Sequence, residues 1–284
     1  MREVLAAALA AEAAGDSAAL VTVVATEGST PQKAGARMLV YADGRSVGTI
    51  GGGCLEAEMS RLAREAIAVR RPRLVPYDLT PDQAADDGLV CGGRMQVFIE
   101  PIEATPVLCL FGAGHVALPL ARMAKACGFR VEVADDRIKF ANAERFPDAD
   151  RIVVEDLVAA AGKLTLGPST YAIVVTRGHT GDRAVLVTVL GRGLRFVGLL
   201  GSRPKVVHIF AALIDKGVRR EDLAEVHAPL GVEIGAQTPD EIAVSILAEM
   251  IAVRRGVDPA SVRSMKMELP GRLGSDAKSK TSLK

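Results

Sequence analysis

The sequence predicts an α/β protein of two domains, with a mixed α/β domain first and a parallel-sheet domain after it. The length of 284 residues suits about two domains at roughly 150 residues each. Apolar residues make up 49% and charged residues 24%, which is ordinary globular usage. In the second half, strand-like runs alternate with helical ones, an order typical of parallel sheets with crossover helices. We place the domains at residues 1–104 and 105–258, followed by a small, polar and basic tail over 259–284 that we expect to be disordered.

The first domain opens on an alanine-rich stretch that predicts an amphipathic helix rather than a signal sequence, because Glu12 interrupts its short apolar run. Runs of β-branched residues bounded by turn signals then predict strands, and an Asp-Gly pair predicts a hairpin turn. A helical spacing follows, and Pro101 and Pro106 mark the domain boundary after the last strand. The predicted strands are 20–26, 37–41, 46–50 and 95–101, and the predicted helix is 55–71.

In the second domain, strand-like segments alternate with segments of helical periodicity. Its strand-like runs are VLCLFGAG, FRVEVADD, RIVVED, YAIVVTRG and RFVGLLGS. Thr238 and Glu241 enclose Pro239 in the pattern of a capping box, which predicts the start of a long closing helix.

Charge and composition exclude several classes of partner. Thirty-five basic and thirty-four acidic residues give a net charge of +1, so the broad attraction to phosphate backbones or anionic bilayers is absent. Three Tyr, seven Phe and no Trp leave few platforms for stacking bases. No run approaches the roughly 20 apolar residues of a membrane span. We expect a cytoplasmic protein that binds neither nucleic acid nor membranes.

A glycine fingerprint follows the first strand of the second domain. Gly112 and Gly114 stand in the spacing Gly-x-Gly-x-x-Ala between an apolar strand and a helix, where glycines admit a phosphate to the helix N-terminus. Asp135, with Asp136 after it, ends the next strand about twenty residues on, where a carboxylate can accept hydrogen bonds from ribose hydroxyls. These features predict a Rossmann-like fold and a candidate nucleotide site. The alternative is that the glycines only let strand and helix pack closely.

Polar side chains follow two further strands of the predicted parallel sheet. Arg177 and His179 come after one strand, and Ser202, Arg203 and Lys205 come after the next. Ligands collect at the carboxyl ends of such strands, so these residues form a candidate anion cradle. For His179 the alternative is a structural role in which its hydrogen bonds are made within the protein. For Ser202 the alternative is that it only caps its helix.

Two of the four cysteines lie beside glycines. Cys54 follows three glycines at a predicted helix start, where unpaired N–H groups and the helix dipole would stabilise a thiolate, and Cys91 precedes two glycines. Cys109 and Cys127 fit core positions instead. Thiolates are soft ligands for transition metals and can carry sulfur as persulfides.

Seven collinear motifs between Val21 and Arg255 resemble the xanthine dehydrogenase accessory proteins, the XdhC/CoxI family. They are GSTPQKAGARMLV, GTIGGGCLEAEM, VCGGRMQVFIEP, FGAGHVALPLA, TRGHTGD, VGLLGSRPK and HAPLGVEIGAQTPDEIAVSILAEM. The resemblance implies an XdhC/CoxI domain followed by a Rossmann-like domain. Some members carry Thr-His-Asp-His where this chain has residues 176–179, so a role for that first histidine is not transferred.

The resemblance also implies a function, which is maturation of a molybdenum hydroxylase. Such a factor binds molybdenum cofactor, as molybdopterin or its dinucleotide form, promotes its sulfuration with sulfur from a cysteine desulfurase, and delivers it to the apoenzyme. We expect a homodimer.

Resemblance and residues together suggest one hypothesis, in which both domains meet the cofactor across a single cleft. Backbone donors around Gly112 to His115, with Arg203 and Lys205, would hold its anionic end. Cys54, with Cys91 as a second candidate, would contact molybdenum transiently or relay sulfur. Two other classes remain open. One is an NAD(P)-dependent oxidoreductase that uses Asp135 and His179, and the other is a nucleotide-sensing module without catalysis.

Overall fold

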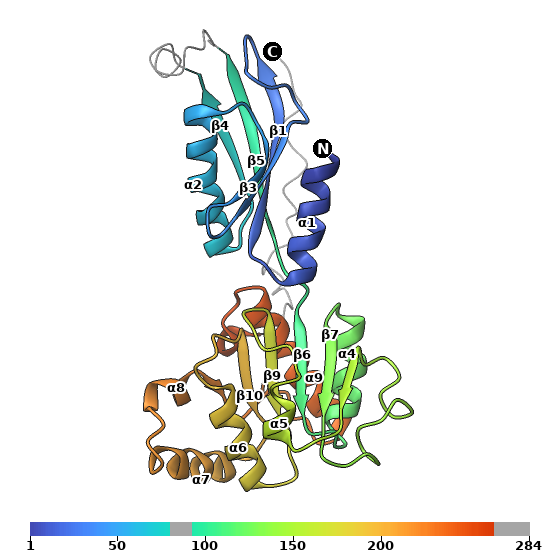
Figure 1. The fold of residues 1–284 in the computed structure, drawn as a ribbon. Coiled ribbons are helices and arrows are strands. Elements are labelled where there is room, and N and C mark those ends of the chain that lie inside the picture. Colours follow the sequence, from blue (N-terminus) through green and yellow to red (C-terminus); the bar gives the residue numbers. More distant parts are fainter. Residues whose placement is uncertain (80–92, 264–284) are drawn as a thin grey trace, which may run out of the picture.

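The computed structural model describes residues 1–79 and 93–263, and Cys91 lies outside this part of the chain. Two β-sheets are stacked end to end, and the chain passes directly from the first into the second where β5 (Arg94–Ile102) is followed by β6 (Val107–Phe111) (Figure 1). The α/β class and the parallel second sheet predicted from the sequence are confirmed.

The first domain is an antiparallel sheet with one helix on each face. Its strands are ordered β3-β2-β1-β5-β4, and α1 and α2 pack on opposite sides because alternate residues of β1 and β2 point to opposite faces. The predicted first helix and strands form, while β4 went unnoticed in the sequence because it contains Pro76, which an edge strand tolerates. The bounds are α1 Arg2–Ala14, β1 Ala18–Glu27, β2 Arg37–Tyr41, β3 Ser46–Thr49, α2 Gly53–Val69 and β4 Arg73–Asp78.

The second domain is a parallel six-stranded sheet covered on both faces. Its order is β11-β10-β9-β6-β7-β8, so the first strand lies in the middle and the chain winds outward in both directions. This is the Rossmann order, and its switch point lies between β6 and β9. The strands are β7 Arg130–Ala134, β8 Arg151–Val153, β9 Thr170–Val174, β10 Phe196–Leu199 and β11 Val226–His227.

Helices α4 and α9 cover one face of this sheet, while α5, α6 and α7 cover the other. The predicted capping box opens α9: the Glu241 N–H donates to the Thr238 hydroxyl at 3.2 Å, and the Glu241 carboxylate accepts from the Thr238 N–H at 2.9 Å. Part of the tail expected to be disordered is instead a short 3₁₀ helix, Pro259–Ser261, and residues 264–284 lie outside the described chain. The helices are α4 Ala117–Ala126, α5 Leu157–Ala160, α6 His179–Val189, α7 Arg203–Ile214, α8 Arg220–Ala224 and α9 Pro239–Arg254.

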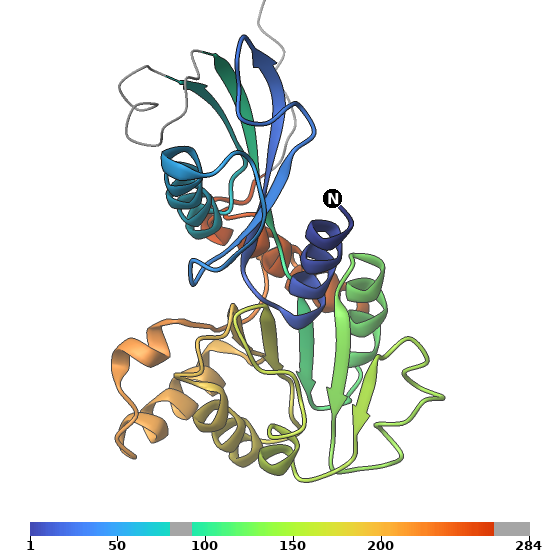
Figure 2. The same cartoon turned by 45° about the horizontal axis from the view of Figure 1, so that its top comes forward.

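The amino edge of the Rossmann sheet faces the first domain. Pro106 and Ser169, which precede β6 and β9, line a pocket together with Ile67 and Arg70 at the carboxyl end of α2. The carboxyl edge of the sheet therefore points away from the first domain, as both views of the ribbon show (Figures 1 and 2). Within residues 1–79 and 93–263, every helix falls short of the length and apolarity that a membrane span requires.

Candidate functional site

A cavity of about 380 Å³ opens at the carboxyl edge of the Rossmann sheet, at the switch point between β6 and β9. Open α/β sheets bind their ligands at this place. Four of the residues predicted from the sequence line the cavity together. They are Gly112, Asp135, Arg177 and His179.

Gly112 forms the tight turn that leaves β6. Its φ of +116° is a conformation that side chains rarely adopt, and a Cβ there would lie 2.5 Å from the carbonyl oxygen of Val175. Gly112 also donates its N–H to Ala134 at 2.8 Å, which ties the turn to β7. This glycine is therefore required by the packing of β6 against its neighbours.

Gly114 has the opposite surroundings, because a Cβ there would meet nothing within 4 Å. Within the described chain, the N–H groups of Gly114, His115 and Val116, the residues that lead into α4, meet no hydrogen-bond acceptor. Such N–H groups at the positive end of a helix form a site for an anion. The space beside the second glycine of the fingerprint is therefore open, although Gly114 and His115 are not among the residues that line the cavity.

Asp135 is committed to the protein itself, which corrects its expected role as a direct ribose ligand. The residue is only 2% exposed, and its carboxylate accepts from the Ala113 N–H at 2.8 Å and from two guanidinium nitrogens of Arg137 at 2.7 and 2.8 Å. Burial alone would raise the pKa of Asp135, but these hydrogen bonds prevail and lower it to about 2. The carboxylate fixes the glycine turn. Arg137, two residues away, was missed although its proximity in sequence was a usable signal.

Replacing Asp135 by asparagine is expected to lower the free energy of unfolding by roughly 2 kcal/mol at pH 7. This is the free energy that corresponds to lowering the pKa of the carboxyl from 3.8 to about 2 on folding. Because the folded-state pKa is depressed, this stabilisation is complete above about pH 5 and is lost as the pH falls. Urea unfolding should show the difference from wild type shrinking to about half at pH 3. A difference independent of pH would contradict this role, and Asp136→Asn is the exposed control.

Asp136 and Arg177 form the charged rim of the cavity. Arg177 Nη2 lies 2.7 Å from Asp136 Oδ2, and both side chains are exposed, so this pair can rearrange when a ligand arrives. His179 begins α6 and is exposed, and its ring meets His208 of α7 edge-on at 5.6 Å between centroids. His208 was missed because only the packing of α6 beside α7 brings the two rings together.

Lys205 is not part of an anion cradle, contrary to expectation. Its ammonium lies 2.7 Å from the fully buried carboxylate of Asp182 and donates to the Leu200 carbonyl at 3.0 Å. Thr176 donates to the other oxygen of Asp182 at 2.7 Å, so this network joins α6, α7 and the end of β9. Ser202 and Arg203 are exposed at the start of α7 and do not line the cavity, and Ser202 makes no side-chain cap bond.

The glycine turn before Cys54 is also occupied. Glu56 turns back and accepts hydrogen bonds at 3.0, 3.3 and 2.9 Å from the N–H groups of Ile50, Gly51 and Gly52. Burial would raise the pKa of Glu56, but these bonds and one from Thr49 lower it. The unpaired N–H groups expected to support a Cys54 thiolate therefore already hold a carboxylate, while Cys54 itself is exposed.

Cys54 and the carboxyl-edge cavity lie at opposite ends of the folded molecule. The hypothesis that both face a single cleft is therefore wrong within one molecule. Cys54 is the second residue of α2, and the other end of this 17-residue helix, about 25 Å away, lines the junction with the Rossmann domain. Strand β6 adds about 16 Å before Gly112 is reached. This separation follows from the topology. Because β5 leads straight into β6, the amino edge of the Rossmann sheet lies at the domain junction and its carboxyl edge lies far from it.

Fold and cavity define a two-domain protein whose Rossmann domain has an open cavity at its switch point. A sequence profile described as the XdhC Rossmann domain matches residues 108–250, and one described as the XdhC and CoxI family matches residues 11–78. The chain belongs to the XdhC and CoxI family.

Three relatives and one solved structure extend the comparison. The chain is 39% identical over 237 residues to the uncharacterized protein YqeB of Escherichia coli (strain K12), aligning 83% of this chain but spanning only 43% of that protein. It is 25% identical to a probable xanthine dehydrogenase subunit of Bacillus subtilis (strain 168), with 85% and 94% of the two chains aligned. It is also 25% identical to the molybdenum cofactor insertion chaperone PaoD of E. coli, with 89% and 88% aligned. A crystal structure described as a xanthine dehydrogenase from Bacillus halodurans shares the fold at 24% identity and a TM-score of 0.50, covering 92% of this chain and 98% of that one.

Proposed function

We propose that this protein is a maturation factor for a molybdenum hydroxylase and that it carries molybdenum cofactor as its cargo. The family and the names of the B. subtilis and E. coli relatives support the class of function. The observation that carries the proposal to this chain is the switch-point cavity, which has an exposed arginine on its rim and Gly112 in its lining. Two residues after Gly112, the chain presents N–H groups without acceptors in the described chain at the start of α4.

The residues of the cavity fit the anionic end of this cargo. Molybdopterin ends in a phosphate, and its dinucleotide form ends in a nucleotide. In the proposed complex the N–H groups of Gly114, His115 and Val116 donate to phosphate oxygens, and Arg177 exchanges Asp136 for the phosphate. His179 lies at the N-terminus of α6 on the same cavity and can donate to the same oxygens.

Cys54 then acts apart from the cavity of its own chain. We propose a two-fold symmetric homodimer whose copies run head to tail, so that Cys54 of each copy reaches cargo held by the other. The exposed thiol accepts sulfur from a cysteine desulfurase: its thiolate attacks the terminal sulfur of the donor persulfide, a new S–S bond forms, and the donor thiolate leaves. We propose that this step takes place in the cytoplasm, where thiols stay reduced. The final partner is the apoenzyme of the hydroxylase, which receives the cargo.

The geometry of Asp135 argues against the alternative of a nicotinamide-dependent oxidoreductase. That alternative used the carboxylate of Asp135 to recognise a ribose, and both of its oxygens are bonded to Arg137 and to the glycine turn. A cargo held mainly by its phosphate does not need this carboxylate.

Mass spectrometry of small molecules released from the protein tests the proposal. The protein is purified anaerobically from a molybdate-replete host, and a host unable to make the pterin provides the control. Recovery of a pterin from the first preparation alone is the expected result. Recovery of a nicotinamide nucleotide without pterin would overturn the proposal.

A further inference from the structure

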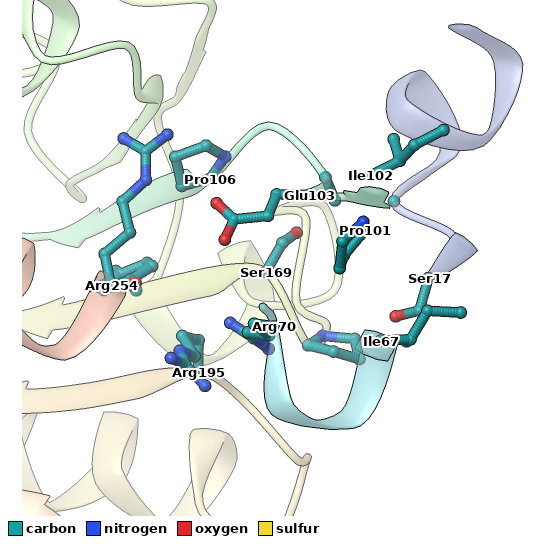
Figure 3. Close-up of a pocket in the computed structure, with 14 residues that line it drawn as sticks. Ser17, Ile67, Arg70, Pro101, Ile102, Glu103, Pro106, Ser169, Arg195 and Arg254 are labelled. Carbon is teal, nitrogen blue, oxygen red and sulfur yellow. The ribbon is translucent and has the colours of Figure 1, made fainter. Parts of the chain in front are cut away.

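A second, smaller cavity lies between the two domains, on the opposite edge of the Rossmann sheet from the cargo site. It has a volume of about 60 Å³ and is lined by the end of α2, the segment that joins β5 to β6, and the residues before β9 and β10 (Figure 3). Three arginines line it, Arg70, Arg195 and Arg254, together with one acidic residue, Glu103. Positive charge therefore exceeds negative charge around a space that both domains enclose.

Arg195 contributes a guanidinium group to the lining of this space. Its Nη2 donates to the Val253 carbonyl at 2.9 Å, but its Nε is buried and meets no acceptor in the part of the chain that the structure describes. A buried donor without an acceptor costs free energy. This Nε is screened from the cavity as well, so a ligand reaches it only when the guanidinium turns. The Tyr171 hydroxyl adjoins the same guanidinium, and burial raises the pKa of Tyr171, which keeps this hydroxyl protonated.

Arg70 reaches the cavity in an unusual backbone conformation. It caps the end of α2 in the left-handed region with φ +53°, and among the described residues it is the one non-glycine residue with positive φ. Glycine is the usual residue at such a position, so the arginine stands there against its own backbone preference. Burial and the positive charge of Arg195 both lower the pKa of Arg70. Figure 3 shows the Arg70 side chain next to Arg195.

Arg254 completes the positive surroundings from the end of α9. Its Nη1 donates to the Cys127 carbonyl at 3.1 Å, and its guanidinium lies over the Phe129 ring at 5.5 Å, so it contributes charge from a fixed position. The volume is about five times the 10–15 Å³ that one water needs, which suits a compact oxyanion of five heavy atoms.

The geometry points to a phosphate-binding site at this domain junction, formed by Arg70 and Arg195 and taking either free phosphate or the terminal monoester of a larger ligand. Guanidinium groups bind such oxyanions through paired, charge-assisted hydrogen bonds. One bound phosphate contacts α2 of the first domain and the start of β10 in the second, so it links the two domains. The site does not depend on the proposed cargo or on the switch-point cavity.

Isothermal titration of the full-length, cofactor-free protein with inorganic phosphate tests this site, with glycerol 3-phosphate in a second arm and nitrate as the control anion. Saturable phosphate binding is expected at the junction, and it should persist in the Arg177→Ala protein, which lacks the arginine of the cargo cavity. Tighter binding of the monoester identifies the end group of a larger ligand, whereas binding of inorganic phosphate alone identifies the free anion. Absence of phosphate binding at millimolar concentrations would overturn the proposal.

Two variants locate the bound phosphate. Arg195→Gln should weaken phosphate about tenfold to one-hundredfold, as expected for the loss of a charge-assisted donor. Arg70→Gly should weaken it at least about tenfold while Tm stays the same or rises, since glycine suits the left-handed cap and the chain still folds. Arg64→Gln removes an exposed arginine of the same helix and should change nothing. Equal affinity in wild type, Arg195→Gln and Arg70→Gly would place phosphate elsewhere and refute the assignment.

Discussion

Replacing Gly112 by alanine is expected to lower the free energy of unfolding by about 3–5 kcal/mol. Two costs add: alanine must adopt a φ of +116°, and its Cβ would stand 2.5 Å from the Val175 carbonyl oxygen. The neighbour is backbone directly after β9, where the Val175 N–H donates to the Phe111 carbonyl at 3.0 Å, so it cannot move aside as a flexible side chain would. Urea denaturation followed by circular dichroism measures the loss.

Gly114→Ala is the matched control within the same fingerprint. Nothing lies within 4 Å of the added Cβ and its backbone conformation is ordinary, so unfolding should change by less than about 0.5 kcal/mol. The methyl group would stand where a phosphate approaches the N–H groups before α4, so cofactor affinity should fall about tenfold. Equal destabilisation by both substitutions would contradict the geometry of this turn.

Replacing Cys54 by serine is expected to reduce activation of the client hydroxylase about 100-fold, because a hydroxyl neither carries sulfur nor binds a soft metal at neutral pH. The residue is exposed in the first turn of α2, so folding should change by less than about 0.5 kcal/mol. Cofactor affinity should fall far less than activation does, since the cavity of the other copy holds the anionic end of the cargo without Cys54. The measurement is client activity after incubation with apoenzyme and cofactor, beside a binding titration.

Cys127→Ser provides the control for that experiment, because this thiol is also exposed but lies at the end of α4. A mixing experiment then tests the head-to-tail dimer. When Cys54→Ser and Arg177→Ala chains are combined, random pairing makes half of the dimers mixed, and each mixed dimer has one intact composite site, so roughly a quarter of wild-type activation should return. Activation no greater than that of the separate variants would contradict a site shared between two copies.

Local sequence signals predicted the Rossmann domain and its glycine turn, because strand, glycines and helix are consecutive and each has its own pattern. The same holds for the capping box of α9, where Thr238 and Glu241 are three residues apart. The bond between Asp135 and Arg137 is equally local and could have been predicted. Its consequence, a carboxylate unavailable to a ribose, follows from that spacing.

Pairings between distant elements could not be predicted in this way. Lys205 reaches Asp182 because α7 packs beside α6, and no periodicity encodes that alignment. The direction of the second sheet relative to the first depends on a short connection between β5 and β6, and this direction separates Cys54 from the cavity.

Hydrogen–deuterium exchange of the protein with and without molybdenum cofactor tests the central claim most directly, which is that the cargo binds at the carboxyl edge of the Rossmann sheet. The account predicts that cofactor slows exchange at the amides of residues 177–180, which line the cavity, and at the amides of residues 114–116 before α4, whether or not residues 49–56 of a partner copy are protected as well. Protection confined to residues 49–56, with no change before α4, would contradict it.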